Sequence, residues 1–431
     1  MIEVRVNNRQ SGRLSKIDRA GSSFVYGGLS DPEQSVSLTM PVQAPSYDWP
    51  YGLLPIFEMN LPEGALRDRL KRDFAKSLGR FDDLDMLAIT GRHQIGRVEY
   101  GASPEIMELT HEHEPGFQSV DAILKARRNG DLFEYLMSRY AGRSGISGVQ
   151  PKVLIRDPGK FSPAVKFSQR LGTASGQGGG RQSVSLSSAT HIVKLWERAE
   201  YPELAANEYF CLRAAGRAGL DVPKIDLSDN GEALIVERFD LDVIAGPAGQ
   251  QARGHYIGFE DFCVLNGVNA SEKYRGSYES KLFRRITDYI APATAHTDML
   301  KLFKLFVLNV AVRNGDAHLK NFGLTYDNLA GNVRLAPVYD IITTTAYVPG
   351  DSMALTLAGS TRWPDRAKLE RLASAYCELS PAQINAVIDQ VCTAVSETRA
   401  ELQDYFAESS GPEVGAYMLR EWETGLSSIG Y

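Results

Sequence analysis

The sequence predicts an α+β protein, because strand-like and helix-like patterns alternate along a long chain. Its 431 residues are enough to bury a large core in two or three packed units. Ile2, Val4 and Val6 alternate with polar residues, which is the period of a half-buried strand. Leu66 and Leu70 lie four apart, which is the period of an amphipathic helix. A small strand-containing N-terminal part and a mostly helical C-terminal part are therefore expected.

Composition favours an ordinary soluble protein. The chain is 43% hydrophobic and 23% charged, with a net charge of −6, so its surface as a whole does not suit a polyanion. Its four cysteines are far apart and include no CxxC pair, which suits a reducing compartment. The N-terminus has no apolar signal region, and the apolar stretch 302–312 is too short to span a bilayer. A cytoplasmic protein without membrane contact is expected.

The chain divides into three consecutive segments at the level of pattern. Residues 1–110 form the first, 119–250 the second and 251–431 the third, with a linker at 111–115. Residues 170–190 are rich in glycine and serine and poor in large apolar residues, so a mobile loop is expected there. Strands are expected at 152–155, 191–195 and 233–237, and helices at 62–78, 202–218 and 381–406, the last with Ser380 as N-cap.

The strongest chemical signal is the segment RNGDAHLKNF at 313–322. Asp316 and Asn321 have the D-x-x-x-x-N spacing of the catalytic loop of protein kinases. In that chemistry a carboxylate orients the acceptor hydroxyl and takes its proton, while an amide oxygen holds Mg²⁺. The alternative is a plain turn, since both residue types are common in loops.

A second carboxylate follows at the expected distance. In RLAPVYDIITT, Asp340 closes an apolar, strand-like run 24 residues after Asp316. Kinases use a carboxylate of this kind as a magnesium ligand. The alternative for Asp340 alone is an aspartate that caps the next element.

Lys194 in HIVKLW is the candidate phosphate-binding lysine, because it is flanked by apolar β-formers as in the V-A-I-K strand of kinases. The alternative is a solvated lysine on a strand face. Glu208 lies on the apolar stripe of the following helix and needs a partner there. Lys194 is the expected partner, and Arg213 or Arg217 is the alternative.

A loop between the expected helix and strand, RSGISGVQPK at 143–152, has glycines that allow backbone amides to approach an anion. It is neither GxGxxG nor a Walker motif, so it predicts a phosphate cover or a plain turn. LIVERFD, at 234–240, ends a strand where a kinase hinge would meet adenine. Metal-hydrolase and serine-hydrolase readings are disfavoured, since neither HExxH nor GxSxG is present.

In this order the motifs resemble the HipA family of bacterial serine/threonine kinase toxins. The resemblance rests on IFEMNLPEGALRDRL, SGVQPK, HIVKL, NEYFCLRAAGRAGL, LIVERFD, GDAHLKNF and VYDIIT, and covers essentially the whole chain. It implies a bilobal, protein-kinase-like fold. An N-terminal HipA-type subdomain would occupy 1–110, a nucleotide-binding lobe 119–250 and a helical catalytic lobe 251–431, with ATP between the last two.

The resemblance also implies roles for individual residues. Asp316 would be catalytic, with His318 supporting the phosphates or the loop, and Asn321 and Asp340 would bind Mg²⁺. The nucleotide contacts would come from Ser147, Gly148, Val149, Gln150, Lys152, Lys194, Glu208, Glu237, Phe239 and Tyr339.

Family members phosphorylate a serine in the glycine-rich loop, which ejects the loop. The family carries this serine three residues before the motif's glycine or directly before it, and these positions are Gly145 and Ser147 here. Ser147 is therefore the expected autophosphorylation site, with Ser144 as the second choice. Close to two added negative charges beside ATP phosphates cannot be accommodated.

Partners follow from the same resemblance. The expected protein substrate is an aminoacyl-tRNA synthetase, and the expected partner is a HipB-like helix-turn-helix antitoxin through which the chain reaches DNA. Two other hypotheses stay open: a degenerate kinase that acts as a co-repressor, and a kinase for a small molecule or lipid, suggested by the GDxHxxN pattern.

Overall fold

The computed structural model describes residues 1–17, 21–28, 31–43, 46–78, 81–91, 93–101, 117–126, 131–157, 159, 184–185, 189–196, 201–244, 252–329, 331–408 and 413–431. The expected linker at 111–115 and most of the expected loop at 170–190 lie outside these residues. Two compact units are formed. Unit 1 comprises Met1–Leu195, Lys224–Glu260 and Thr325–Asn332, and unit 2 comprises Trp196–Pro223, Asp261–Leu324 and Val333–Tyr431.

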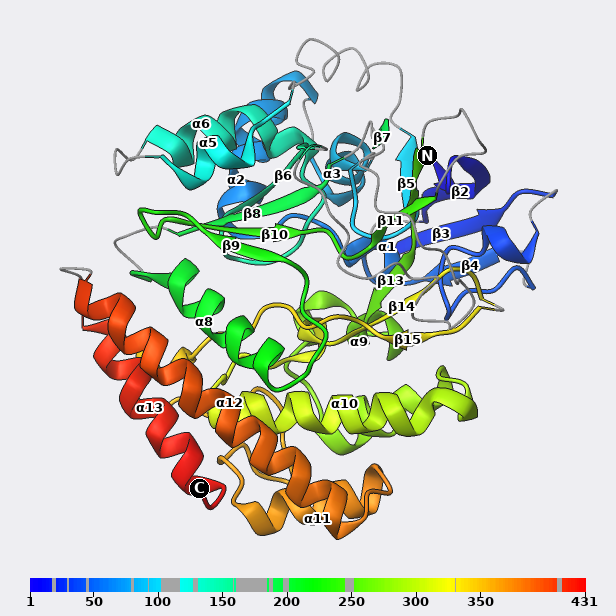
Figure 1. Cartoon of the computed structure of the whole chain (residues 1–431). Coiled ribbons are helices and arrows are strands. Elements are labelled where there is room, and N and C mark those ends of the chain that lie inside the picture. Colours follow the sequence, from blue (N-terminus) through cyan, green and yellow to red (C-terminus); the bar gives the residue numbers. More distant parts are fainter. Residues whose placement is uncertain are drawn as a thin grey trace. The chain divides into compact units, whose positions relative to one another are not determined.

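Unit 1 begins with a five-stranded sheet whose neighbouring strands are all antiparallel (Figure 1). The expected alternation at the N-terminus is confirmed, because Ile2, Val4 and Val6 are buried on β1. The helix expected from residue 62 begins two residues later, at Gly64. In sheet order the strands are β4 (Ser46–Trp49), β3 (Gly21–Tyr26), β2 (Arg9–Ile17), β1 (Ile2–Val6) and β5 (Val98–Gly101), and the helices are α1 (Pro55–Glu58), α2 (Gly64–Leu78) and α3 (Asp83–Thr90).

A second sheet of unit 1 confirms the three strands expected in the middle of the chain. Its order is β6 (Lys152–Ile155), β8 (His191–Leu195), β10 (Ala233–Glu237) and β9 (Ile225–Leu227), with antiparallel neighbours. The helices α5 (Val120–Leu124) and α6 (Asp131–Tyr140) pack on this sheet (Figure 1). One smaller sheet has the strand order β11 (Leu241–Ile244), β12 (Ala252–Tyr256) and β7 (Val184–Ser185). Another has the order β13 (Gly258–Asp261), β14 (Gly323–Tyr326) and β15 (Arg334–Leu335).

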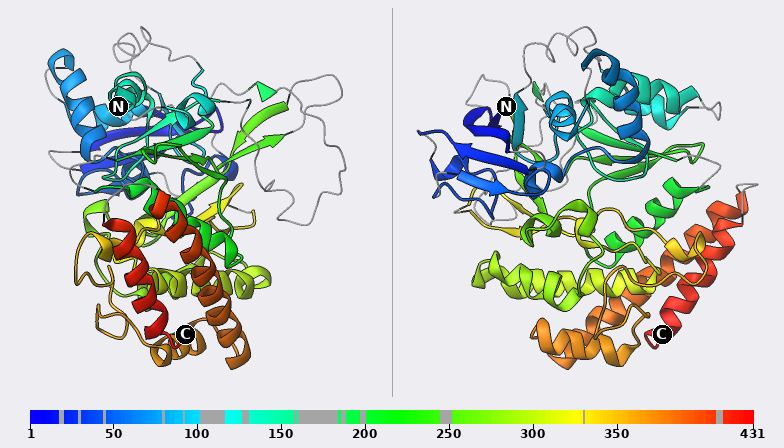
Figure 2. Two further views of the ribbon diagram at one scale, coloured as in Figure 1. Left: turned by 60° about the vertical axis from the view of Figure 1, so that its left-hand side comes forward. Right: turned by 180° about the vertical axis from the view of Figure 1, so that it is seen from behind.

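Unit 2 is built on α12 (Pro381–Glu408), which packs against four other helices. Figure 1 shows α12 across α10, and both views of Figure 2 show α12 beside α13. Ser380 and Gln383 cap α12 reciprocally, with Gln383 Oε1 accepting from the Ser380 amide at 3.0 Å, as the Ser-Pro start predicts. The four partners are α8 (Leu204–Arg217), α10 (Pro292–Ala311), α11 (Arg366–Tyr376) and α13 (Val414–Ser428), and α9 (Phe262–Leu265) is a further short helix.

The strand expected directly before Asp340 is wrong. Only Arg334–Leu335 forms strand β15, and the residues from Ala336 to Asp340 belong to no regular element. Pro337 has no amide hydrogen and cannot donate to a ladder. The flanking amides bond in different directions, since Ala336 donates to Gly323 O at 2.9 Å and Val338 to Asp221 O at 2.7 Å.

Four other points of the sequence analysis can be compared with the structure. All four cysteines are buried and none forms a disulfide, which agrees with their wide spacing in the sequence. The solvated-lysine alternative for Lys194 is wrong, because this residue is only 4% exposed. Arg213 and Arg217 pair with Glu401 on α12, at 3.2 Å for Arg213, which disfavours both as partners of Glu208. Within the described ranges, no helix combines the length and apolar character needed to cross a bilayer.

Candidate active site

The loop that carries Asp316 is presented by the end of α10. Arg313 takes a left-handed conformation (φ 57°) directly after the helix, which ends it and turns the chain. The Asn314 amide donates to Asn309 O at 2.9 Å, and its side chain donates to Asn309 Oδ1 at 2.7 Å. Asn314 Oδ1 in turn accepts from the Asp316 amide at 3.2 Å. A buried helix end therefore fixes the backbone on which the candidate base stands.

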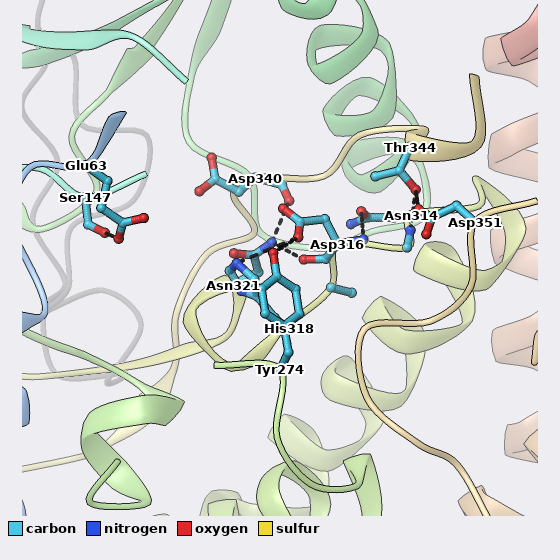
Figure 3. Close-up of polar contacts among 12 residues, drawn as sticks. Glu63, Ser147, Tyr274, Asn314, Asp316, His318, Asn321, Asp340, Thr344 and Asp351 are labelled. Atoms are coloured by element: carbon cyan, nitrogen blue, oxygen red, sulfur yellow. Dashed lines mark hydrogen bonds and ion pairs between the residues drawn. The ribbon is translucent and has the colours of Figure 1, made fainter. Parts of the chain in front are cut away.

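Asp316, Asn321 and Asp340 come together in unit 2 (Figure 3). Asn321 Nδ2 donates to the backbone oxygen of Asp316 at 2.7 Å and lies 3.5 Å from that of Asp340. Because the amide nitrogen is used in this way, the amide oxygen of Asn321 is the atom left to act as an acceptor or metal ligand. The two segments that the sequence singled out are thus joined by one side chain.

Burial raises the pKa of Asp316 above its ordinary value. A hydrogen bond from the Tyr274 hydroxyl (2.7 Å to Oδ1) and the positive charge of Lys273 act in the opposite direction. Asp340 and Asp351 raise the pKa further, because each adds a like charge nearby. A carboxylate whose pKa is raised in this way is a better proton acceptor than an exposed one.

His318 is held uncharged beside the candidate base. Burial lowers its pKa to about 3, and Lys273 lowers it further. Its Nε2 is 3.9 Å from Asp316 Oδ1, and its ring meets the Tyr274 ring edge-on with centroids 4.9 Å apart. Its Nδ1 is buried and lacks a hydrogen-bond partner in the part of the chain that the structure describes. A neutral ring suits a hydrogen-bonding or packing role rather than a charge on phosphate.

Asp340 is in a left-handed backbone conformation, with φ of 51°. Such residues are uncommon outside glycine, and Asp and Asn tolerate them best. Its neighbour Tyr339 donates from its hydroxyl to Lys320 O at 3.0 Å, so it ties the Asp340 segment to the loop that carries Asp316. The chain therefore adopts an uncommon backbone conformation at the candidate metal ligand.

Three residues near Asp316 were missed by the sequence reasoning. Thr344 Oγ1 accepts from the Gly315 amide at 2.7 Å and donates to Asp351 Oδ2 at 2.5 Å (Figure 3). Tyr274, described above, comes from a turn 42 residues earlier. Thr344 ends the segment RLAPVYDIITT, whereas Tyr274 and Asp351 belong to none of the motifs above. Only the folded chain reveals that these side chains lie near Asp316.

The lysines expected to meet phosphates lie in unit 1. Lys152 on β6 and Lys194 on β8 are directly opposite each other, so both side chains leave the same face of the sheet. They are only 3% and 4% exposed. Two lysine side chains on one face bring two positive charges to it, which is the charge that an anion needs.

The glycine-rich loop contacts the residue that precedes α2, within unit 1. Ser147 Oγ donates to Glu63 Oε1 at 2.5 Å (Figure 3). The ammonium of Lys152 donates to Ser147 O at 3.1 Å. Gly148 has φ of 119°, a conformation that L side chains rarely adopt. Val149 is 65% exposed, and Gln150 is half-buried.

The two serine candidates differ in environment. Ser147 is half-buried, whereas Ser144 is fully buried. The Ser144 hydroxyl donates to Tyr140 O at 2.8 Å and accepts from the Leu154 amide at 2.9 Å.

The expected adenine segment ends β10. The amides of Glu237 and Arg238 already donate, to Lys224 O at 2.9 Å and Thr190 O at 3.0 Å. The Arg238 side chain is buried in an ion pair with Asp240 at 2.6 Å. Phe239 is half-buried against Phe259, with ring centroids 5.4 Å apart. The two amides therefore hold the strand end in place and are not available to a base edge.

Glu208 is buried on α8 in unit 2, at 1% exposure, whereas Lys194 belongs to unit 1. Their pairing stays a prediction. No group of three or more histidine, cysteine, aspartate or glutamate side chains placed for a metal ion occurs among the described residues. The amide of Asn321 and the carboxylate of Asp340 still fit Mg²⁺, which takes few protein oxygens and completes its shell with phosphates and water.

A loop carboxylate, an amide five residues later and a second carboxylate from a distant turn define a kinase-like site in an α+β protein. The chain belongs to the HipA family. The profile of the HipA-like C-terminal domain matches residues 144–399, and that of the HipA N-terminal domain matches residues 2–101.

Named relatives agree with this assignment. Putative kinase Y4mE of Sinorhizobium fredii is 31% identical over 53% of this chain and 54% of its own length, so the match spans about half of that protein. Putative kinase Y4dM of the same organism is 28% identical over 93% of this chain and 90% of its own. The fold is similar to HipA in the Shewanella oneidensis MR-1 complex of HipA, HipB and operator DNA, with a TM-score of 0.60, 18% identity, and coverage of 99% and 96% of the two chains.

Proposed function

We propose that this protein is an ATP- and Mg²⁺-dependent serine/threonine-protein kinase that acts as the toxin of a toxin–antitoxin pair. The observation that carries the proposal is the hydrogen bonding of Asn321 to the backbone of Asp316, at 2.7 Å, and toward that of Asp340. One amide then joins the two carboxylate segments that a phosphoryl transfer needs.

Each residue has a distinct role in the proposed reaction. Asp316 orients the acceptor hydroxyl and takes its proton, and its neighbour His318, which is uncharged, keeps the loop in place. Asn321 and Asp340 hold Mg²⁺, which neutralises negative charge on the phosphates when it is bound. Lys152 and Lys194 receive the phosphate oxygens, since both are buried on one face of their sheet. Phe239 packs near adenine.

The test is phosphotransfer by the purified chain with labelled ATP and Mg²⁺. Asp316→Asn keeps an oxygen that accepts from Tyr274 and removes only the charge. We expect a loss of about 10²–10⁴-fold in rate, the usual contribution of a positioned base. Its melting temperature should match or exceed that of the wild type, because burial, Asp340 and Asp351 all disfavour this charge. Labelling equal to the wild type would exclude Asp316 as the base, and nucleotide binding without transfer by the wild type would favour a co-repressor.

We further propose that Ser147 is phosphorylated by the kinase itself. Its hydroxyl donates a hydrogen bond to the carboxylate of Glu63 at 2.5 Å. A phosphate on Ser147 would be repelled by that carboxylate, and the loop would lose its contact with Glu63. The burial of Ser144 argues against that second choice. Ser147→Ala should prolong activity in the presence of ATP, whereas Ser144→Ala should not, and phosphopeptide mapping identifies the site directly.

The protein substrate is proposed from the family resemblance to be an aminoacyl-tRNA synthetase, and the partner a HipB-like antitoxin that binds DNA. The similar Shewanella HipA is described in a complex with HipB and operator DNA. Phosphoproteomics after a short pulse of expression in a translating lysate tests the substrate. Labelling of metabolites or lipids without any labelled protein would instead support a small-molecule kinase.

A further inference from the structure

We propose that Tyr274 is a phosphoryl acceptor of this protein's own active site. This inference rests on the proposed kinase activity and extends it, within the chain itself, from serine and threonine to one tyrosine acceptor. The residue lies in unit 2, in the turn that follows Ala270–Glu272.

The Tyr274 hydroxyl occupies the position that an acceptor must take on the candidate base. It donates to Asp316 Oδ1 at 2.7 Å (Figure 3). A general base must be within roughly 2.6–3.2 Å of the hydroxyl that it deprotonates. The contact is therefore the one that an attacking hydroxyl needs.

The surroundings of Tyr274 differ from those of a structural tyrosine. Tyr278, four residues later, is 1% exposed and donates to Ala317 O at 2.9 Å, which is a packing role. Tyr274 is 51% exposed, so the described part of the chain does not enclose it. Its turn is nevertheless fixed, since Lys273 O accepts from the Leu319 amide at 3.2 Å and its ring packs edge-on against His318.

The chemistry balances with ATP as the only co-reactant. The phenolic oxygen attacks the γ-phosphorus and forms the new O–P bond, while the bond from that phosphorus to the bridging oxygen breaks. The electron pair of the broken bond leaves with ADP, and the phenolic proton passes to Asp316. Among side-chain hydroxyls, a phenol, with a pKa of about 10, gives up its proton most readily.

The product would not remain where it formed. A phosphate on Tyr274 carries about −1.5 to −2 charges and would lie against the carboxylate of Asp316. Lys273 is adjacent, with its ammonium 5.3 Å from the centre of the Tyr274 ring, and the flanking Arg275, whose side chain is 82% exposed, pairs with Glu272 at 3.1 Å. Repulsion between the new phosphate and the carboxylate of Asp316 would move the ring outward and free Asp316 for an external hydroxyl.

The experiment is a time course of the full-length protein with Mg²⁺-ATP, followed by digestion after glutamate and mass spectrometry. Cleavage after Glu272 and Glu279 gives one peptide that contains Tyr274 and Tyr278, and fragmentation separates them. We expect phosphate on Tyr274 and not on Tyr278 in the wild type. Tyr274→Phe should lose at least 90% of total phosphotyrosine, whereas Tyr201→Phe, a control that is 41% exposed, should lose none.

The outcomes separate the two proposals. Serine phosphorylation in the wild type with an unmodified Tyr274 would overturn the acceptor role and leave the kinase proposal intact. Absence of transfer to any residue would overturn the kinase proposal and this one with it. Because the wild-type peptide is read directly, a Tyr274→Phe variant that folds poorly does not affect the decision.

Discussion

At the residue scale, the pKa of Asp316 sets an expected pH dependence. Its pKa is raised by burial and by the nearby carboxylates, so the carboxyl keeps its proton at a pH where exposed aspartates have lost theirs. The base form is required for proton uptake. We expect the rate to fall on acidification through this raised pKa.

The acidic limb of the pH–rate profile, in which the rate falls with falling pH, measures this effect. The acceptor used should not itself titrate in that range. Asp351→Asn removes a negative charge that raises the pKa of Asp316, so the limb should move to lower pH. A profile whose acidic limb lies in the ordinary aspartate range, and which Asp351→Asn leaves unmoved, would contradict the assignment.

Asp340 gives a second residue-scale prediction that depends on its left-handed backbone (φ 51°). Asp340→Asn keeps a residue type that tolerates this conformation but removes the charge. Activity should fall and the Mg²⁺ concentration for half-maximal rate should rise, while the melting temperature stays near that of the wild type.

Asp340→Ala is the matched comparison. It loses the same ligand and adds roughly 1–2 kcal/mol of backbone strain, so it should melt at a lower temperature than Asp340→Asn. An unchanged Mg²⁺ requirement in both variants would remove Asp340 from the metal site.

At the scale of elements, the loop that carries Asp316 depends on the segment around Thr344. The hydroxyl of Thr344 accepts from the buried Gly315 amide at 2.7 Å. A valine of similar shape would leave that amide without its acceptor, at a cost of about 1–3 kcal/mol. Thr344→Val should therefore lower both the melting temperature and the rate of phosphotransfer.

Thr287→Val is a suitable control, because the Thr287 residue is exposed and its hydroxyl donates to the local Arg284 carbonyl at 2.7 Å. Water can replace that bond, so we expect a change of less than about 0.5 kcal/mol in stability. Equal effects of the two substitutions in thermal denaturation would show that Thr344 has no special role in holding the loop.

At the scale of the whole molecule, Glu260 is expected to link folding to pH. It is fully buried in unit 1, where it accepts from Leu38 N at 2.7 Å, from Ser37 Oγ at 2.8 Å and from the Tyr326 hydroxyl. Burial raises its pKa from 4.5 to about 7, although the hydrogen bonds lower it. The folded protein thus holds a proton between these pH values that the unfolded chain has released.

The stabilising contribution of this proton is complete below pH 4.5 and is lost as the pH rises through about 7. Glu260→Gln resembles the protonated form and should flatten that part of the profile. Denaturant unfolding between pH 5 and pH 8 measures the effect, relative to a wild type that loses stability as the pH rises. A variant with the same slope as the wild type would exclude Glu260 as the linked group.

The sequence by itself determined the features that are written in short stretches of chain. The alternation at Ile2–Val6 predicted β1, the Ser380–Pro381 start predicted α12, and the spacing of Asp316 and Asn321 placed both on one loop. Such patterns are local, because hydrogen bonds and side-chain periodicity within an element involve residues a few positions apart.

Only the tertiary structure decided which distant groups meet that loop. Tyr274 reaches Asp316 from 42 residues away, and Thr344 reaches Gly315 from 29. The apolar run before Asp340 looked like a strand, yet Pro337 and divergent amide partners keep it irregular. These contacts depend on how whole helices and sheets pack, and packing leaves no periodic signature in the residues that happen to touch.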